Sequence, residues 1–105
     1  MEDLKGYQKK YLRGLAHGLK PVVFVGQKGF TDALVREVGG ALKTHELIKV
    51  KFVDFKEKDQ KETIAASIVA ATGAAMAGMI GHMAIFYLRH PDPDKRKIKL
   101  PTQSE

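Results

Sequence analysis

The chain changes from strand to helix within one short stretch, residues 21–31, which reads PVVFVGQKGFT. The run Val22–Val25 predicts a buried strand, because β-branched side chains pack well on a covered, pleated surface. Thr31 is suited to cap a helix whose apolar face recurs at three- and four-residue steps. That face consists of Leu34, Val38, Ala41 and Leu42. Because a helix then separates two strands, the sheet is predicted to contain a parallel pair.

Another helix is predicted before this stretch, over residues 4–17, because apolar residues recur there at helical spacing. Its apolar stripe consists of Leu4, Tyr7, Tyr11 and Leu15. Lys9, Lys10 and Arg13 lie off this stripe and are expected to face water. Gly18 stands where a left-handed C-cap would end the helix.

A second strand is predicted over residues 47–53, where apolar and polar side chains alternate. Alternation sends the apolar set, Ile48, Val50 and Phe52, to one face of the strand. Lys49 and Lys51 therefore share the other face, which predicts either a polar outer surface or part of a basic binding surface.

The C-terminal half predicts a helix and a hairpin. Charged residues 54–61 lead into the helix, which is expected to end at Gly73. Its buried side is predicted to hold Ile64, Ile68 and Ala71. Strands over residues 75–80 and 83–88 flank Gly81-His82, a plausible hairpin turn. The element order α-β-α-β-α-β-β predicts a compact single α/β domain with parallel and antiparallel pairs.

Positive charge is concentrated near the N-terminus. The 105 residues include 18 Lys and Arg against 12 Asp and Glu, a net charge of +6. Residues 1–30 carry six basic and two acidic side chains, so +4 of this total lies there. Such an excess favours a polyanionic partner such as nucleic acid.

The composition also indicates where the protein is located and which partners are not expected. Without cysteine there is no disulfide, thiolate nucleophile or sulfur-ligated metal, and the cytoplasm is the expected location. The N-terminus lacks the apolar core of a signal peptide, and the apolar residues 64–88 are interrupted by glycines. We therefore expect no membrane partner.

No enzyme signature is evident. The segment GQKGFT, residues 26–31, lacks the spacing of a P-loop and the third glycine of a dinucleotide fingerprint. Histidines fall on different predicted elements, so no metal site is expected. They are His17, His45, His82 and His90. We accordingly predict no catalytic residue, no cofactor and no small-molecule substrate.

The GQKG loop, residues 26–29, has a better physical role as a backbone contact. Gly26 and Gly29 allow a tight turn and leave no Cβ to hold a ligand backbone away. Lys28 adds a mobile charge, and the following helix N-terminus favours phosphate. An ordinary turn remains the alternative, because glycine is a generic loop residue. Phe30, beside the loop, is a candidate for stacking on a base or for packing against the helix.

Five stretches of the chain strongly resemble the CRM domain, named for chloroplast RNA splicing and ribosome maturation. They are residues 12–29 (LRGLAHGLKPVVFVGQKG), 45–51 (HELIKVK), 72–73, 80–81 and 97–101 (KIKLP). The last stretch is similar to the ending of single-domain bacterial members, the YhbY type. The resemblance covers nearly the whole chain, so we expect a CRM-like RNA-binding domain over residues 1–101 and a short tail over 102–105.

The resemblance implies a fold similar to the C-terminal domain of bacterial translation initiation factor three, with a four-stranded mixed sheet packed with helices. It implies RNA binding through the GxxG loop and nearby basic residues, and stand-alone members are associated with assembly of the large ribosomal subunit. The expected RNA-binding residues are Arg13, Lys20, Gly26, Gln27, Lys28, Gly29, Thr31, Lys49 and Lys51. His82 departs from the basic residue expected after Gly81, so that turn is assigned no role.

Two other function classes compete with RNA binding. A protein-interaction module would dock through the Ala- and Met-rich residues 74–79 onto a ribosomal protein or a second copy of the chain. An enzyme acting on a phosphorylated small molecule at the helix N-terminus is the weakest alternative, because no acid, base or nucleophile lies near the loop. We expect a monomer in the absence of RNA.

Overall fold

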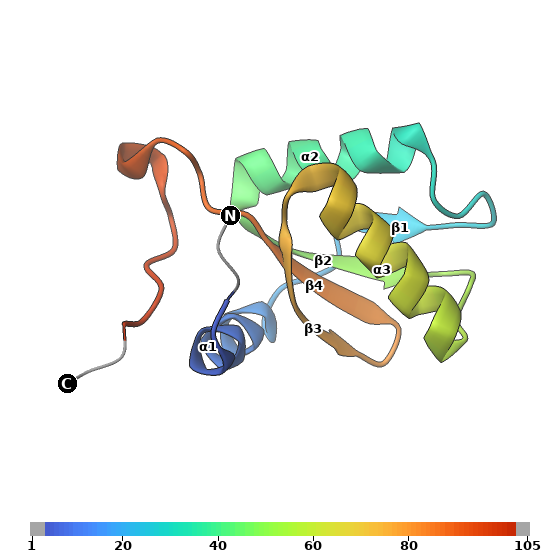
Figure 1. Cartoon of the computed structure of the whole chain (residues 1–105), viewed down its shortest axis with the longest axis horizontal. Coiled ribbons are helices and arrows are strands. Elements are labelled where there is room, and N and C mark those ends of the chain that lie inside the picture. Colours follow the sequence, from blue (N-terminus) through green and yellow to red (C-terminus); the bar gives the residue numbers. More distant parts are fainter. Residues whose placement is uncertain (1–3, 103–105) are drawn as a thin grey trace.

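A computed structural model describes residues 4–102 and contains a four-stranded sheet with three α-helices (Figure 1). The elements in chain order are α1 (Gly6–Ala16), β1 (Val23–Val25), α2 (Asp32–His45), β2 (Leu47–Phe52), α3 (Lys58–Thr72), β3 (Ala75–Ile80), β4 (Met83–Tyr87) and a short 3₁₀ helix, η1 (Pro93–Lys95). This order confirms the predicted α/β architecture.

The sheet is mixed, with strand order β1-β2-β4-β3. The crossover through α2 makes β1 and β2 parallel, as predicted. β4 pairs antiparallel with both β2 and β3, and the β3–β4 turn is made at Gly81, whose φ is +59°. The register along β3 shifts between Met76 and Gly78, which marks a β-bulge in this edge strand.

The two faces of the sheet are covered unequally. α2 and α3 lie over one face and bury the larger core, which includes Val50, Phe52 and Phe86 (Figure 1). α1 packs on the opposite face, where it buries a smaller cluster with Leu47 and Tyr87. Within residues 4–102, the cover on this face consists of the 11-residue α1 and the C-terminal residues Ile98 and Leu100, so part of the face stays exposed.

The predicted apolar stripe of α1 is wrong in its position. Leu12 and Ala16 are completely buried, whereas Tyr11 and Leu15 are more than 40% exposed. Leu12 and Ala16 of α1 therefore face the core together with Leu4, which precedes the helix, and the three are spaced by multiples of four residues. The predicted left-handed cap at Gly18 is also absent: His17 ends the helix with ordinary right-handed angles.

β1 is not buried on both faces. It lies at an edge of the sheet, and only Val23 and Val25 point into the core. Val22 and Phe24 remain 46% and 53% exposed. Periodicity could not reveal this difference, because four apolar residues in a row look the same whether one or both faces are covered.

α3 begins at Lys58, inside the charged segment that was expected to precede it. Its buried residues are Ile64, Ala65 and Ile68, so the prediction is correct for both isoleucines. Ala71 is exposed, contrary to prediction. Gly73 ends the helix in the predicted left-handed conformation, with φ of +78°.

A buried carboxylate holds the C-terminal segment against the sheet. Glu46 is 1% exposed and follows α2 with φ of +63°. Its oxygens accept hydrogen bonds from the backbone N–H groups of His90 (2.9 Å), Lys97 and Ile98 (3.0 Å). Burial alone would raise the pKa of Glu46, but these backbone donors outweigh it and hold the pKa below its usual value. The Glu46 clasp, as we call this contact, fixes the segment without a regular strand.

Candidate nucleic-acid interface

The GQKG loop forms a tight turn between β1 and α2. Gly29 donates its N–H to the carbonyl of Gly26 at 2.9 Å, which places Gln27 and Lys28 at the corner of a β-turn. Both corner side chains are exposed. The loop projects at one end of the molecule, beyond the end of β1 (Figure 1).

The two glycines of the loop have different reasons to be glycine. Gly29 adopts φ of +65°, and a Cβ there would lie 3.1 Å from the ring of Phe55. The turn itself therefore requires Gly29. A Cβ at Gly26 would meet nothing within 4 Å, and its φ is not positive. Gly26 therefore has no structural reason to be glycine, whereas Gly29 has one; the approach of an external backbone at both stays a prediction.

Thr31 serves primarily as the helix cap. Its Oγ1 accepts the N–H of Leu34 at 3.1 Å, as the sequence predicts. Asp32, in the first turn, adds a negative charge at this helix end. Because the hydroxyl is already engaged and a carboxylate lies next to it, the α2 N-terminus offers less attraction for phosphate than expected.

Three of the predicted cationic residues gather around β2, on the face that α1 only partly covers. Lys49 donates its ammonium to the carbonyl of Leu19 at 2.9 Å, and so ties the loop after α1 to the sheet. Lys20 follows directly and is exposed. Lys51, two residues along β2, points to the same face and is also exposed.

Arg13 lies apart from these lysines, and it does not face water as predicted. Its Nη1 donates to the carbonyl of Ala77 at 2.9 Å on the far edge strand β3. A Cβ at Gly78 would lie 2.6 Å from its Cδ, so the arginine stem fills the space beside that glycine. Arg13 thus holds α1 on β3, a role that the sequence did not indicate.

Phe30 borders an open hollow of about 390 Å³ between the GQKG loop and the start of α3. Phe55 and Asp59 line the same hollow. Lys28 also lines it, so opposite charges meet on this side of the loop. The hollow that carries Lys51 has no acidic residue in its lining and is therefore better suited to a nucleic acid backbone.

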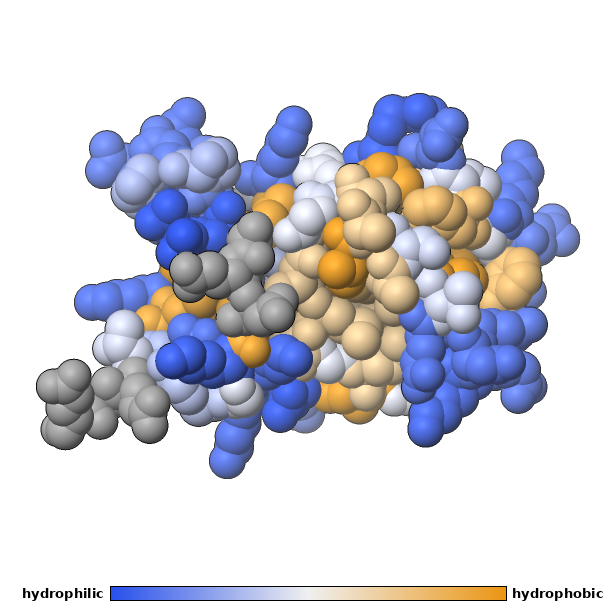
Figure 2. All heavy atoms as spheres, viewed as in Figure 1, coloured by the Kyte–Doolittle hydropathy of each residue, from blue (hydrophilic) through white to orange (hydrophobic). Residues whose placement is uncertain are grey.

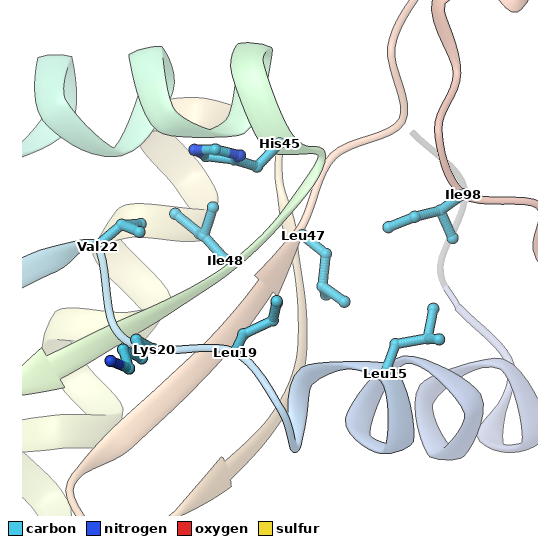
Figure 3. Close-up of a pocket in the computed structure, with 8 residues that line it drawn as sticks. All are labelled: Leu15, Leu19, Lys20, Val22, His45, Leu47, Ile48 and Ile98. Atoms are coloured by element: carbon cyan, nitrogen blue, oxygen red, sulfur yellow. The ribbon is translucent and has the colours of Figure 1, made fainter.

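An apolar groove of about 480 Å³ lies at the N-terminal end of β2 (Figure 3). Leu15, Leu47 and Ile98 point toward one another across it, whereas the side chain of Lys20 points away (Figure 3). The groove brings together α1, β2 and the C-terminal segment and is distinct from the GQKG loop. Its lining is suited to apolar contact and not to phosphate.

The face that carries α3 is a poor candidate for the interface. Small and apolar side chains cover its centre, and hydrophilic side chains gather around the beginning of α3 (Figure 2). Acidic Asp59 and Glu62 alternate there with Lys58 and Lys61, so the local charges largely cancel. Lys49 and Lys51, in contrast, share the α1 side of the sheet.

Residues 4–102 offer neither a metal site built from clustered side chains nor a membrane-spanning helix. No group of three or more histidine, aspartate or glutamate side chains in this range could hold a metal ion. Nor is any helix in the range long and apolar enough to cross a membrane.

Comparison with known proteins gives consistent matches. A family model described as the CRS1 / YhbY (CRM) domain matches residues 4–88. A Haemophilus influenzae protein named "RNA-binding protein" is 43% identical over 96% of this chain and 98% of its own length. A Bacillus subtilis protein named "Probable RNA-binding protein YqeI" is 33% identical over 93% and 99%.

A solved structure agrees with the fold. The solution structure of a hypothetical protein from Staphylococcus aureus superimposes with a TM-score of 0.78 at 32% sequence identity. The match covers 93% of this chain and 99% of that one.

Proposed function

This chain belongs to the CRS1/YhbY (CRM) domain family, and on that premise we propose that it is an RNA-binding protein that joins a precursor of the large ribosomal subunit during assembly. RNA contacts are made by the GQKG loop together with Lys20, Lys49 and Lys51. The relatives named RNA-binding proteins support the general activity. The ribosomal role is the specific part of the proposal.

One observation carries the loop assignment. Gly26 is a glycine that the fold does not need, since a side chain there would enter open space. It lies beside the exposed Lys28 in a turn that projects from the domain. A backbone free of a Cβ next to a mobile cation is the arrangement by which GxxG loops clamp a nucleic acid backbone.

The loop assignment is tested by a charge reversal with a matched control. Lys28→Glu should weaken binding to a ribosomal RNA fragment and flatten the salt dependence, because a phosphate contact becomes a repulsion. Lys43→Glu makes the same change at the opposite end of α2, roughly 20 Å away by helix rise. Equal affinities of the two variants at several salt concentrations would contradict the loop assignment.

The ribosomal role is tested by sedimentation of the tagged protein from its native cells in low salt. We expect a peak at or just below the large subunit that disappears after nuclease treatment. A peak that survives complete RNA digestion would instead support docking on a protein. Protein confined to the top fractions would contradict the assembly role. RNA binding itself would then be decided by the assay with the ribosomal RNA fragment.

A further inference from the structure

Four residues form one row across the sheet on the face that α1 leaves uncovered. Phe24 is paired with Lys51, Lys51 with Met83, and Met83 with Ile80. Directly paired residues project from the same face, so the four side chains lie side by side. Phe24 and Ile80, at the two edges of the sheet, are 53% and 57% exposed. We call this set the exposed row.

The exposed row lies beyond the reach of α1. The cluster under α1 includes Leu47, Ile85 and Tyr87 of the central strands but no member of the exposed row. The β3–β4 hairpin extends past α1 toward the end of the molecule that carries the GQKG loop (Figure 1). Within residues 4–102, no helix covers the three apolar side chains around the exposed Lys51, of which Met83 is half-buried.

The charge around the exposed row fits a polyanion. A hollow of about 320 Å³ between the row and α1 is lined in part by Lys49, Lys51, His17 and His82. None of its lining residues is acidic. In the hollow beside Phe30, in contrast, the charge of Lys28 is opposed by Asp59. Phe24 does not line this hollow but is the cross-strand neighbour of Lys51, which does. Aromatic rings beside a positively charged groove are the combination with which single-stranded nucleic acid is bound.

The exposed row is continuous with the proposed loop contact. Phe24 precedes Gly26 by only two residues, about 7 Å along an extended strand. An RNA backbone that crosses the loop at Gly26 can therefore continue over the α1 side of the sheet. The row spans three strand spacings, roughly 14 Å, and RNA-binding sheets use aromatic residues to stack two or three bases.

We propose that the exposed row binds an unpaired nucleotide, whose base stacks on Phe24 while Lys51 contacts an adjacent phosphate. This inference rests on the proposed RNA-binding function and specifies the kind of RNA: a single strand, a loop or a bulge. It also moves the stacking residue from Phe30, the candidate suggested by sequence, to Phe24. Bases in a continuous duplex present no free face, so they cannot make this contact.

The test uses the full chain, a single-stranded oligouridine of twelve nucleotides and a duplex RNA of equal length. Phe24→Leu should weaken binding to the single strand at least about fivefold, the lower end of the range for loss of one stacked base. The salt dependence should stay unchanged, because no phosphate contact is lost. Duplex binding should not respond. Phe30→Leu, the same change at another exposed phenylalanine, should have little effect on either RNA.

Photocrosslinking gives a readout that does not depend on affinity. Oligouridine carrying 5-iodouridine should crosslink to Phe24, and the crosslinked peptide is identified by mass spectrometry. Because Phe24 is more than half exposed, the leucine variant should keep the thermal midpoint of the native chain.

The outcomes separate this inference from the proposed function. Native affinity of Phe24→Leu for oligouridine, with crosslinks absent from β1, would overturn base stacking even if Lys28→Glu weakens binding as expected. In that case the row is a surface for a protein or remains bare. Failure of the native chain to bind either RNA, or a ribosomal RNA fragment, would overturn both proposals.

Discussion

The GQKG loop and the Glu46 clasp are both irregular segments, but their polar groups are used in opposite ways. In the clasp, three backbone donors converge on one buried carboxylate. In the loop, Gly29 donates a hydrogen bond to Gly26 across the turn and lies beside the ring of Phe55. The side chains of Gln27 and Lys28, in contrast, are exposed. The comparison shows that one segment is fixed by its interactions within the chain, whereas the other presents polar groups for an external partner.

The largest effect is expected at the clasp. Glu46→Ala removes the acceptor of three backbone N–H groups at once and should lower the free energy of unfolding by about 3 kcal/mol. RNA affinity measured well below the melting temperature should not change. Chemical denaturation and RNA titration of the same preparation check both statements. A variant with native stability would show that the Glu46 clasp contributes nothing to the stability of the fold.

Acid should weaken the clasp in part. The folded-state pKa of Glu46 is lowered by its backbone donors, so its stabilisation is fully present at neutral pH and is lost as the pH falls through that pKa. The loss should be smaller than for Glu46→Ala, because a protonated carboxyl still accepts hydrogen bonds. Thermal midpoints between pH 7 and pH 3 measure it. Glu46→Gln is the control and should show a flatter pH profile than the native chain.

The two loop glycines should separate folding from binding. Gly29→Ala places a Cβ at positive φ and against Phe55, so it should destabilise the domain by about 2 kcal/mol. Gly26→Ala should leave stability within about 0.5 kcal/mol of native. It should nevertheless weaken RNA binding, because the new methyl group points to where the backbone approaches. Unfolding and RNA titration of both variants check this; equal RNA affinity for Gly26→Ala and the native chain would remove the main support for the loop.

The smallest effects are expected from the paired lysines of β2. Lys51→Ala should reduce the salt slope of single-stranded RNA binding by about 0.7, with no change in stability. Lys49→Ala should reduce the slope similarly, and in addition lower stability by up to about 1 kcal/mol, because Lys49 also holds the carbonyl of Leu19. Identical stability of the two variants would mean that the Lys49 contact has no structural role.

Most of the fold could be predicted from local patterns, but the positions of some side chains could not. The cap at Thr31, the apolar face of α2, the alternation in β2 and the end of α3 at Gly73 all depend on neighbours within a few residues. The core face of α1 was predicted wrongly, because the helix is amphipathic on two adjacent sides. Contact with the sheet decides that Leu12 and Ala16 are buried while Tyr11 and Leu15 stay exposed.

The candidate site shows the same limit. The GQKG motif and the shared face of Lys49 and Lys51 were visible in the sequence. The different roles of Gly26 and Gly29 were not visible there. They depend in part on the ring of Phe55, which lies against Gly29 although it is 26 residues away along the chain. Similarly, no pattern in the sequence indicated that Arg13 would reach a carbonyl of β3.

By itself the sequence determined the order of the elements, the parallel crossover and the concentration of basic residues, because periodicity, caps and charge are local properties of the chain. The tertiary structure alone decided which part of the sheet α1 covers and which part it leaves open. It thereby exposed Phe24, a residue that looks like core in the sequence, beside Lys51. The physical reason is that burial depends on what packs against a residue from elsewhere in the chain, and an edge strand beyond the end of a short helix has no such partner.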